Sequence, residues 1–244
     1  MCFRCDKYSR LPAHLQTCLA LIAVYSTTFF GGPRQSSESP KAPAGGCTPP
    51  PAIILGNPPM ALDMQEDGNW CWAASGKMIM ENYSQSVDQC REVDDRHSNE
   101  LQGADCCAPQ LALLRGQDGD PCNLTGWPEF CLHKINNSIL KGKGLTWDEL
   151  KTELGCRKSP VAFSWMWDTA GHGHMMVAVG YSSDSNMVFV NDPELSGGQR
   201  ISYESYAAAT FVTFPDGYQE HKHWDDFYHF QPDPGTTCTD ANHE

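Results

Sequence analysis

One cysteine of the chain, Cys71, stands where a catalytic thiol would stand. The apolar residues between 70 and 79 recur at helical spacing, which predicts a helix from residue 70 or 71 to Tyr83. Gly68-Asn69 lies just ahead and is expected to cap it. In the first turn of a helix, unpaired N–H groups and the helix dipole lower a thiol's pKa. The resulting thiolate can attack a carbonyl carbon.

A cysteine nucleophile also needs a base, a group that orients the base, and donors for the oxyanion. His172 and His174 begin an apolar segment, Asp192 follows the next one, and the amide of Gln65 lies six residues before Cys71. Each residue alone has an ordinary interpretation, as a core or disulfide cysteine, a satisfied histidine or a turn residue. Their order and spacing together indicate acyl transfer through a thiol.

The elements that must position these residues differ between the two halves of the chain. Residues 60–155 are predicted to be helical and rich in loops. Thr146–Glu149 forms a capping box that opens a short helix through Leu154, and Gly155 is expected to end that helix. After Pro160 the pattern predicts strands over 161–167, 174–181 and 187–191, with a turn between the last two. The fold class is therefore α+β, with an antiparallel sheet in the C-terminal half.

Both ends of the chain differ from its body. Residues 1–30 combine a basic start with a short apolar run and are interpreted as a leader resembling a secretory signal. A membrane anchor or a misplaced start codon is the alternative. Residues 31–51 are rich in Gly, Pro and Ser and are interpreted as a linker. This leaves one catalytic domain over 52–232 and a tail over 233–244.

The composition excludes several functions. With 17 Lys and Arg against 30 Asp and Glu, the net charge is −13, which argues against a nucleic-acid partner. No uninterrupted apolar run is long enough for a multi-span membrane protein, so no membrane association is expected beyond the possible N-terminal signal. Twelve cysteines favour a secreted, periplasmic or extracellular location.

The cysteine count leaves one thiol over. Three cysteines fall in the leader and nine in the remainder, so eight are available for up to four disulfides, whose pairing stays open. Among the nine cysteines after the leader there is no C-x-x-C pair for structural zinc. Histidines 221, 223 and 229 with two aspartates could hold a metal, but a solvated acidic segment is expected there. We therefore expect no metal or cofactor.

Three motifs carry a resemblance to papain-like cysteine peptidases. Residues 65–74 resemble their Gln-x5-Cys-Trp-Ala signature, 174–181 resemble their His-Ala-x-x-x-Val-Gly-Tyr strand, and 190–193 resemble the turn that holds the third catalytic residue. Asp followed by Pro in that turn, and the short spacing from Cys71 to His174, resemble the shorter branch of bacteriocin-leader peptidases (C39-like). The resemblance covers roughly residues 60–230.

The resemblance implies a role for each residue. Cys71 would attack, His174 would act as base and then as acid, and Asp192 would orient His174. Gln65, with the backbone N–H of Cys71, would bind the oxyanion. The strand register selects His174 over His172, which is expected at the cleft rim. The implied fold has two parts with a cleft between them.

The predicted function is therefore a cysteine endopeptidase, a monomer that acts on polypeptide substrates. One alternative is a transglutaminase or amidase, because the same triad serves any acyl-thioester. The other is a binding module without activity. Four intact residues, Gln65, Cys71, His174 and Asp192, argue against a silent site.

Overall fold

The computed structural model describes residues 46–56, 59–167, 172–211, 221–236 and 238, so the predicted leader lies outside the described residues. The helical elements are α1 (Cys71–Asn82), α2 (Gln89–Arg96), α3 (Pro109–Ala112), α4 (Trp147–Lys151), the π-helical turn η1 (Thr152–Arg157) and α5 (Tyr203–Tyr206). The strands are β1 (Ala52–Ile54), β2 (Ile135–Lys141), β3 (Val161–Met166), β4 (Gly173–Ser182), β5 (Met187–Asn191), β6 (Gln199–Ser202) and β7 (Lys222–Pro232).

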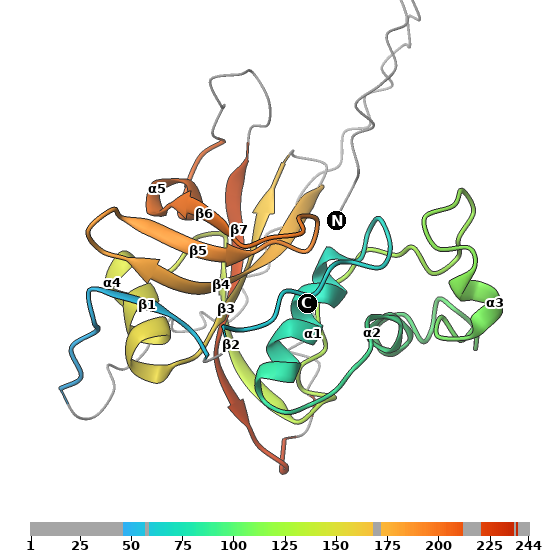
Figure 1. The fold of residues 1–244 in the computed structure, drawn as a ribbon. Coiled ribbons are helices and arrows are strands. Elements are labelled where there is room, and N and C mark those ends of the chain that lie inside the picture. The colour runs from blue at the N-terminus through green and yellow to red at the C-terminus, as the bar shows by residue number, and fades with distance from the viewer. Residues whose placement is uncertain (1–45, 57–58, 168–171, 212–220, 237, 239–244) are drawn as a thin grey trace, which may run out of the picture.

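The seven strands form one antiparallel sheet. The order along it is β2-β7-β3-β4-β5-β6. Strand β3 pairs with β4 as far as Ala178, and β1 pairs with the remaining end of β4 from Gly180 to Ser182. Helices α1, α2 and α3 lie together on one side of the molecule, and the sheet lies on the other (Figure 1). The predicted α+β class with an antiparallel sheet is confirmed.

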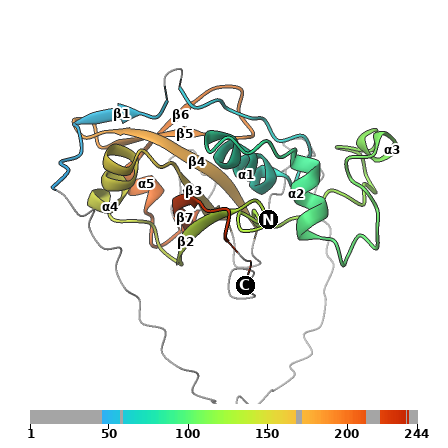
Figure 2. The ribbon, with the colours of Figure 1, turned by 90° about the horizontal axis from the view of Figure 1, so that it is seen from below.

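Strand β4 separates two hydrophobic cores. Met175, Val177 and Val179 pack into the core that includes α1, whereas Met176 and Ala178 pack into the core that includes η1 and α5. Both faces of a strand are buried when helices cover both faces of its sheet, which explains its continuous apolar sequence. The view from below shows α1 and α4 on either side of β4 (Figure 2). This strand therefore connects the helical half to the sheet half.

The sequence predicted the central elements well. Helix α1 and strands β3, β4 and β5 begin and end within about two residues of the predicted bounds. The capping box of α4 is present, with Thr146 and Glu149 each bonding the other's backbone. Gly155, however, does not end this helix, which continues to Arg157 and ends at Lys158 with φ of 57°. A Cβ on Gly155 would lie 2.7 Å from the Tyr181 hydroxyl, so this glycine is needed for close packing.

Four strands of the sheet, β1, β2, β6 and β7, were not predicted, and two of them contradict what was expected of their segments. β2 lies in the half interpreted as helical, and β7 lies where a solvated acidic segment was expected. That expectation was wrong, because His223 and Asp226 are both buried. Their side chains pair at 3.0 Å, and Asp226 also accepts hydrogen bonds from the N–H of Leu145 and the hydroxyl of Tyr206. These partners compensate the charge of Asp226, which therefore lies inside the domain.

Four disulfides join eight of the described cysteines. They are Cys47–Cys156, Cys90–Cys107, Cys106–Cys122 and Cys131–Cys238. The first holds the segment before β1 to η1, and the backbone of Pro51 accepts a hydrogen bond from Ser183 N. Within the described part of the chain, no helix is long and apolar enough to cross a membrane.

Candidate active site

Cys71 opens helix α1, as the sequence predicts. Its N-cap residue, Trp70, makes no side-chain capping bond, and the predicted cap at Gly68-Asn69 was wrong. The first N–H groups of a helix have no partner within it, so they remain available to a ligand. The sulfur of Cys71 accepts a hydrogen bond from the backbone N–H of Met175 at 3.3 Å. Sγ therefore lies beside the residue that follows His174.

Cys71 is almost fully buried, with 1% of its surface exposed. It is also one of the disulfide-bonded cysteines of the structure. The thiol that nucleophilic chemistry requires is therefore the reduced form of this residue.

The loop before α1 (residues 65–70, here the approach loop) is clamped to residues 122–124. Asn69 donates its backbone N–H to Asn123 Oδ1 at 2.8 Å and its side-chain amide to Asn123 O at 3.0 Å. The indole of Trp70 donates to Cys122 O at 2.8 Å, and that of Trp72 to Leu124 O at 3.1 Å. These bonds explain why Asn69 does not cap the helix, since its side chain is used elsewhere.

His174 and Asp192 form a close pair at the ends of β4 and β5. Nε2 of His174 lies 2.6 Å from Oδ1 of Asp192, and His174 is 5% exposed. Because a carboxylate only accepts, Nε2 carries the hydrogen. The other ring nitrogen, Nδ1, is buried and has no hydrogen-bond partner among the described residues. Nδ1 is therefore the nitrogen that is left to take a proton.

The surroundings of Asp192 keep it ionised. Burial raises the pKa of its carboxyl, but the hydrogen bond and charge of His174, together with the N–H of Glu194, outweigh burial and lower this pKa overall. Glu194 N donates to the same oxygen at 3.0 Å. The next carbonyl, of Pro193, accepts from Gln65 N at 2.9 Å. One backbone bond thus ties the Asp192 turn to the approach loop.

Gln65 reaches the site from the approach loop, but its amide is already bonded. Nε2 donates to the carbonyls of Asp67 and Gly68, both at 2.9 Å, and these acceptors identify it as the nitrogen. Both amide hydrogens are engaged in this way. The side chain braces the loop, and it can donate to an oxyanion only by exchanging one of these bonds.

One contact of the site was not predicted, since Trp167 was expected to pack in the core rather than to line the substrate groove. Trp167 stacks on the His174 ring, with centroids 5.8 Å apart and planes inclined by 21°. Such a ring shields the imidazole and its bond to Asp192 from water. His172 accepts a backbone hydrogen bond from Trp167 N at 2.7 Å, which turns the chain between β3 and β4. Tryptophans near strands are common in protein cores, so the sequence alone does not identify the contact between Trp167 and His174.

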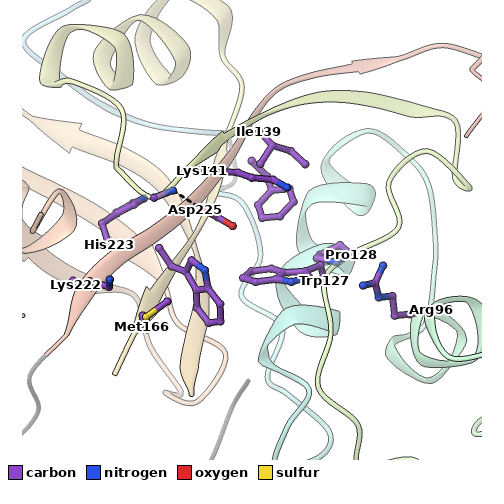
Figure 3. A pocket seen from close by; sticks show the side chains of 12 residues that line it. Arg96, Trp127, Pro128, Ile139, Lys141, Met166, Lys222, His223 and Asp225 are labelled. Atoms are coloured by element: carbon purple, nitrogen blue, oxygen red, sulfur yellow. Dashed lines mark hydrogen bonds between the residues drawn. The ribbon is translucent and has the colours of Figure 1, made fainter. Parts of the chain in front are cut away.

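A cavity of about 410 Å³ lies between the two halves. Its walls include Trp127, Trp224 and Met166, and Figure 3 shows Trp127 between Arg96 on α2 and the side chains of β3 and β7. Met166 pairs in the sheet with Gly173, which precedes His174. The ring of Trp224 would lie 3.1 Å from a Cβ on Gly173. The cavity therefore adjoins the strand end that carries His174.

The cavity also adjoins the segment that carries Cys71. A Cβ on Gly126 would lie 3.0 Å from the Trp72 ring, and Trp127 follows directly.

The structure brings the four predicted site residues together in part. Cys71 lies next to Met175, His174 pairs with Asp192, and Gln65 is bonded to the turn that contains Asp192. Asn123 and Trp127 were missed, because nothing in their local sequence indicates contact with residues more than fifty positions away.

Comparison with known proteins found one matching family and similar solved structures. The model of the Peptidase_C39 like family matches residues 59–223. No curated protein matches the chain. Among solved structures, xylellain, a cysteine protease from Xylella fastidiosa, is similar with 15% sequence identity and a TM-score of 0.40. That similarity covers 74% of this chain and 87% of that chain.

Proposed function

The chain belongs to the Peptidase_C39 like family of cysteine peptidases, and from this premise we propose that it hydrolyses peptide bonds with Cys71, His174 and Asp192. The observation that carries the proposal is the site geometry. The His174–Asp192 pair leaves Nδ1 without a hydrogen-bond partner among the described residues, and Cys71 Sγ lies against the neighbouring Met175.

In the reduced enzyme, Nδ1 of His174 takes the proton of the Cys71 thiol. The thiolate attacks the peptide carbonyl, and the imidazolium then protonates the leaving amine, so that an acyl-thioester forms. Water, deprotonated by the same nitrogen, hydrolyses the thioester and restores the thiol. Asp192 keeps Nε2 protonated and stabilises the imidazolium, because its carboxylate accepts that hydrogen throughout.

The oxyanion is bound at the start of α1. The backbone N–H of Cys71 lies in the first turn of the helix, at the positive end of the helix dipole. Gln65 contributes a second donor when one of its bonds, to Asp67 O or Gly68 O, is exchanged for the oxyanion. Donors of this kind stabilise the charge that develops in the transition state.

The substrate is a polypeptide, one of whose side chains enters the cavity between the halves. Its walls of Trp127, Trp224 and Phe227 favour a large apolar side chain. The four disulfides between described residues fit an oxidising compartment, so secretion remains our proposal for its location.

The test is labelling by an epoxide thiol inhibitor after mild reduction, with the modified residue mapped by mass spectrometry. We expect rapid modification of Cys71 in parallel with loss of peptide hydrolysis. Cys71→Ser should be neither labelled at this position nor active, and its melting temperature in the reducing buffer should equal that of the parent protein.

Two outcomes would contradict the proposal. Rapid modification of a different cysteine, with Cys71 unlabelled, would remove the assigned nucleophile. Labelled Cys71 with transfer of the acyl group to an added amine, and no hydrolysis, would instead identify an acyl transferase.

A further inference from the structure

Asp67 is a buried acid at the centre of the approach loop. It is 3% exposed. Its Oδ1 accepts the N–H of Gly68 at 2.6 Å and that of Gly116 at 3.2 Å. Its other oxygen, Oδ2, is buried and receives no hydrogen bond from any donor among the described residues. One side of this carboxyl group is thus satisfied and the other is not.

Asp120 has the same division of its two oxygens. Oδ1 accepts the N–H of Cys122 at 2.8 Å, and Oδ2 is buried with no donor among the residues that the structure describes. The two carboxyl groups lie close enough that a proton on one would bond the other. Two carboxylates in contact cannot both be ionised without strong repulsion. A single proton between them provides the missing donor for both.

Asp67 is central to the geometry of the loop. Its carbonyl oxygen accepts from Gln65 Nε2 at 2.9 Å and from Trp70 N at 3.2 Å. Asp120 stands two residues before Cys122, whose carbonyl holds the Trp70 indole. The pair therefore connects the approach loop to the segment that clamps it.

We propose that Asp67 and Asp120 share one proton, and that this proton holds the approach loop in its catalytic position, so that activity falls as the pH rises and the proton is lost. Asp67 and Asp120 are positioning residues in this proposal, which rests on the proposed peptidase function. Without the proton, two negative charges in contact push the loop away from residues 116–124. Gln65 and the start of α1 move with it, and the oxyanion donors lose their alignment.

The charged groups around the pair do not replace the proton. Glu66 lies on the surface and pairs with Arg115, and Glu194 lies across a pocket of about 420 Å³ that Asp67 also lines. Burial first, and then the bond and charge of Asp120, raise the pKa of Asp67 from 3.8 to about 6, against the opposing effect of the Gly68 and Gly116 N–H groups.

The sign of the pH dependence follows from this raised pKa. A group whose pKa is higher in the folded than in the unfolded protein binds its proton more tightly when folded. Its stabilisation is complete below pH 3.8 and is lost as the pH rises through about 6. We therefore expect both stability and activity to decline in this window.

The test replaces Asp120 with Asn in the whole protein. The amide Nδ2 donates to Asp67 Oδ2 at every pH, while Oδ1 still accepts from Cys122 N. Asp118→Asn is the matched control, because Asp118 is exposed on the same loop and the charge change is the same. Melting temperature and kcat/KM are measured at closely spaced pH values from about 4 to 8.

We expect the melting temperature of the parent and of Asp118→Asn to fall across this range, and that of Asp120→Asn to fall less. The alkaline limb of kcat/KM should move to higher pH in Asp120→Asn but not in Asp118→Asn. Asp67→Asn, whose amide would face Asp120, should behave like Asp120→Asn.

Three results would overturn the proposal. Identical melting profiles of Asp120→Asn and Asp118→Asn would mean that no shared proton exists. A flattened melting profile with an unchanged kcat/KM profile would mean that the pair does not position the site. A shift on adding EDTA that Asp120→Asn abolishes would assign a bound cation to the pair. If no variant hydrolyses peptide, the peptidase function fails, but the melting profiles still test the proton.

Discussion

The two halves of the molecule position the proposed catalytic residues by different means. In the sheet half, His174 lies on β4 and Asp192 directly follows β5, and backbone ladders fix the register of these two strands, with Val177 opposite Asn191. In the helical half, Cys71 begins a helix whose approach loop is held by side chains, chiefly Asn123, and by the Cys106–Cys122 disulfide next to it. Neither half contains a complete site.

The difference shows which half tolerates change. A strand in the middle of a sheet is held by neighbours on both sides, so one side-chain substitution leaves its register intact. A loop has no ladder, and the position of its backbone depends on a few specific bonds. We therefore expect substitutions in the sheet half to affect chemistry through the catalytic atoms alone, and those in the helical half to act through position as well.

The largest effect is expected at His174. His174→Ala removes base and acid together, so turnover should fall on the order of 10³-fold or more. His172→Ala should lower turnover far less, because His172 is predicted to lie at the rim of the cleft. Steady-state kinetics with one peptide substrate measures both variants, and circular dichroism checks that the strand register is unchanged. Reversed effects would show that the assignment of the two histidines is wrong.

Asp192 should show the next largest effect, with a distinctive pH dependence. Asp192→Asn keeps the shape and one acceptor but removes the charge that stabilises the imidazolium. We expect partial activity and an alkaline limb of kcat/KM that moves to lower pH. Asp192→Ala should lose more, because the ring is then unoriented as well. An unchanged pH profile in both variants would mean that Asp192 only forms the turn and does not act on His174.

The carboxylate of Asp192 should also contribute to stability. Its pKa is lowered in the folded protein, so this contribution is present above pH 3.8 and is lost as the pH falls through the lowered value. Melting temperatures of the parent and of Asp192→Asn should therefore converge in strong acid.

Removing disulfides should separate stability from activity most clearly. Cys106 and Cys122 close a loop of 16 residues, and their replacement by Ala should cost about 3 kcal/mol together with most of the activity. Cys47 and Cys156 are 109 residues apart, so their replacement should cost more stability, about 4–5 kcal/mol. Per folded molecule, however, kcat should hardly change in the second variant. Chemical denaturation combined with active-site titration measures both quantities.

The cavity between the halves should give a smaller effect on substrate binding. Trp127→Ala opens the wall supplied by the helical half, and KM for peptides with a bulky apolar side chain should rise about tenfold. Leu113→Ala is the control, because Leu113 is an exposed apolar residue outside the cavity wall. Equal KM values in the two variants would mean that substrate side chains do not enter the cavity.

The smallest effect is expected at the capping box of α4, a helix that packs against the sheet. Glu149→Ala removes the bond from Thr146 N to the Glu149 carboxylate and should cost about 1 kcal/mol of folding stability. Turnover at a temperature well below melting should not change. A fall in turnover would show that α4 transmits position to the site, contrary to the contrast between the halves.

The sequence by itself determined the elements that carry the chemistry. Apolar spacing located α1 with Cys71 in its first turn, because helical periodicity is a local property. The apolar runs located β4 and β5, with His174 and Asp192 at their ends, for the same reason. The α+β class followed from the order of these elements.

Only the tertiary structure decided how these elements are held. The pairing of eight cysteines and the clamp of Asn123 on Asn69 join residues far apart in the chain, so no local pattern specifies them. The sequence of β7 suggests exposed charges. The groups that hydrogen-bond to Asp226 belong to Leu145 and Tyr206, which are distant in the chain, so the sequence alone does not show that Asp226 is buried. The contact between Asp67 and Asp120 is of the same kind. Each carboxyl is unremarkable in the sequence, and the raised pKa of Asp67 arises only because folding buries it beside Asp120.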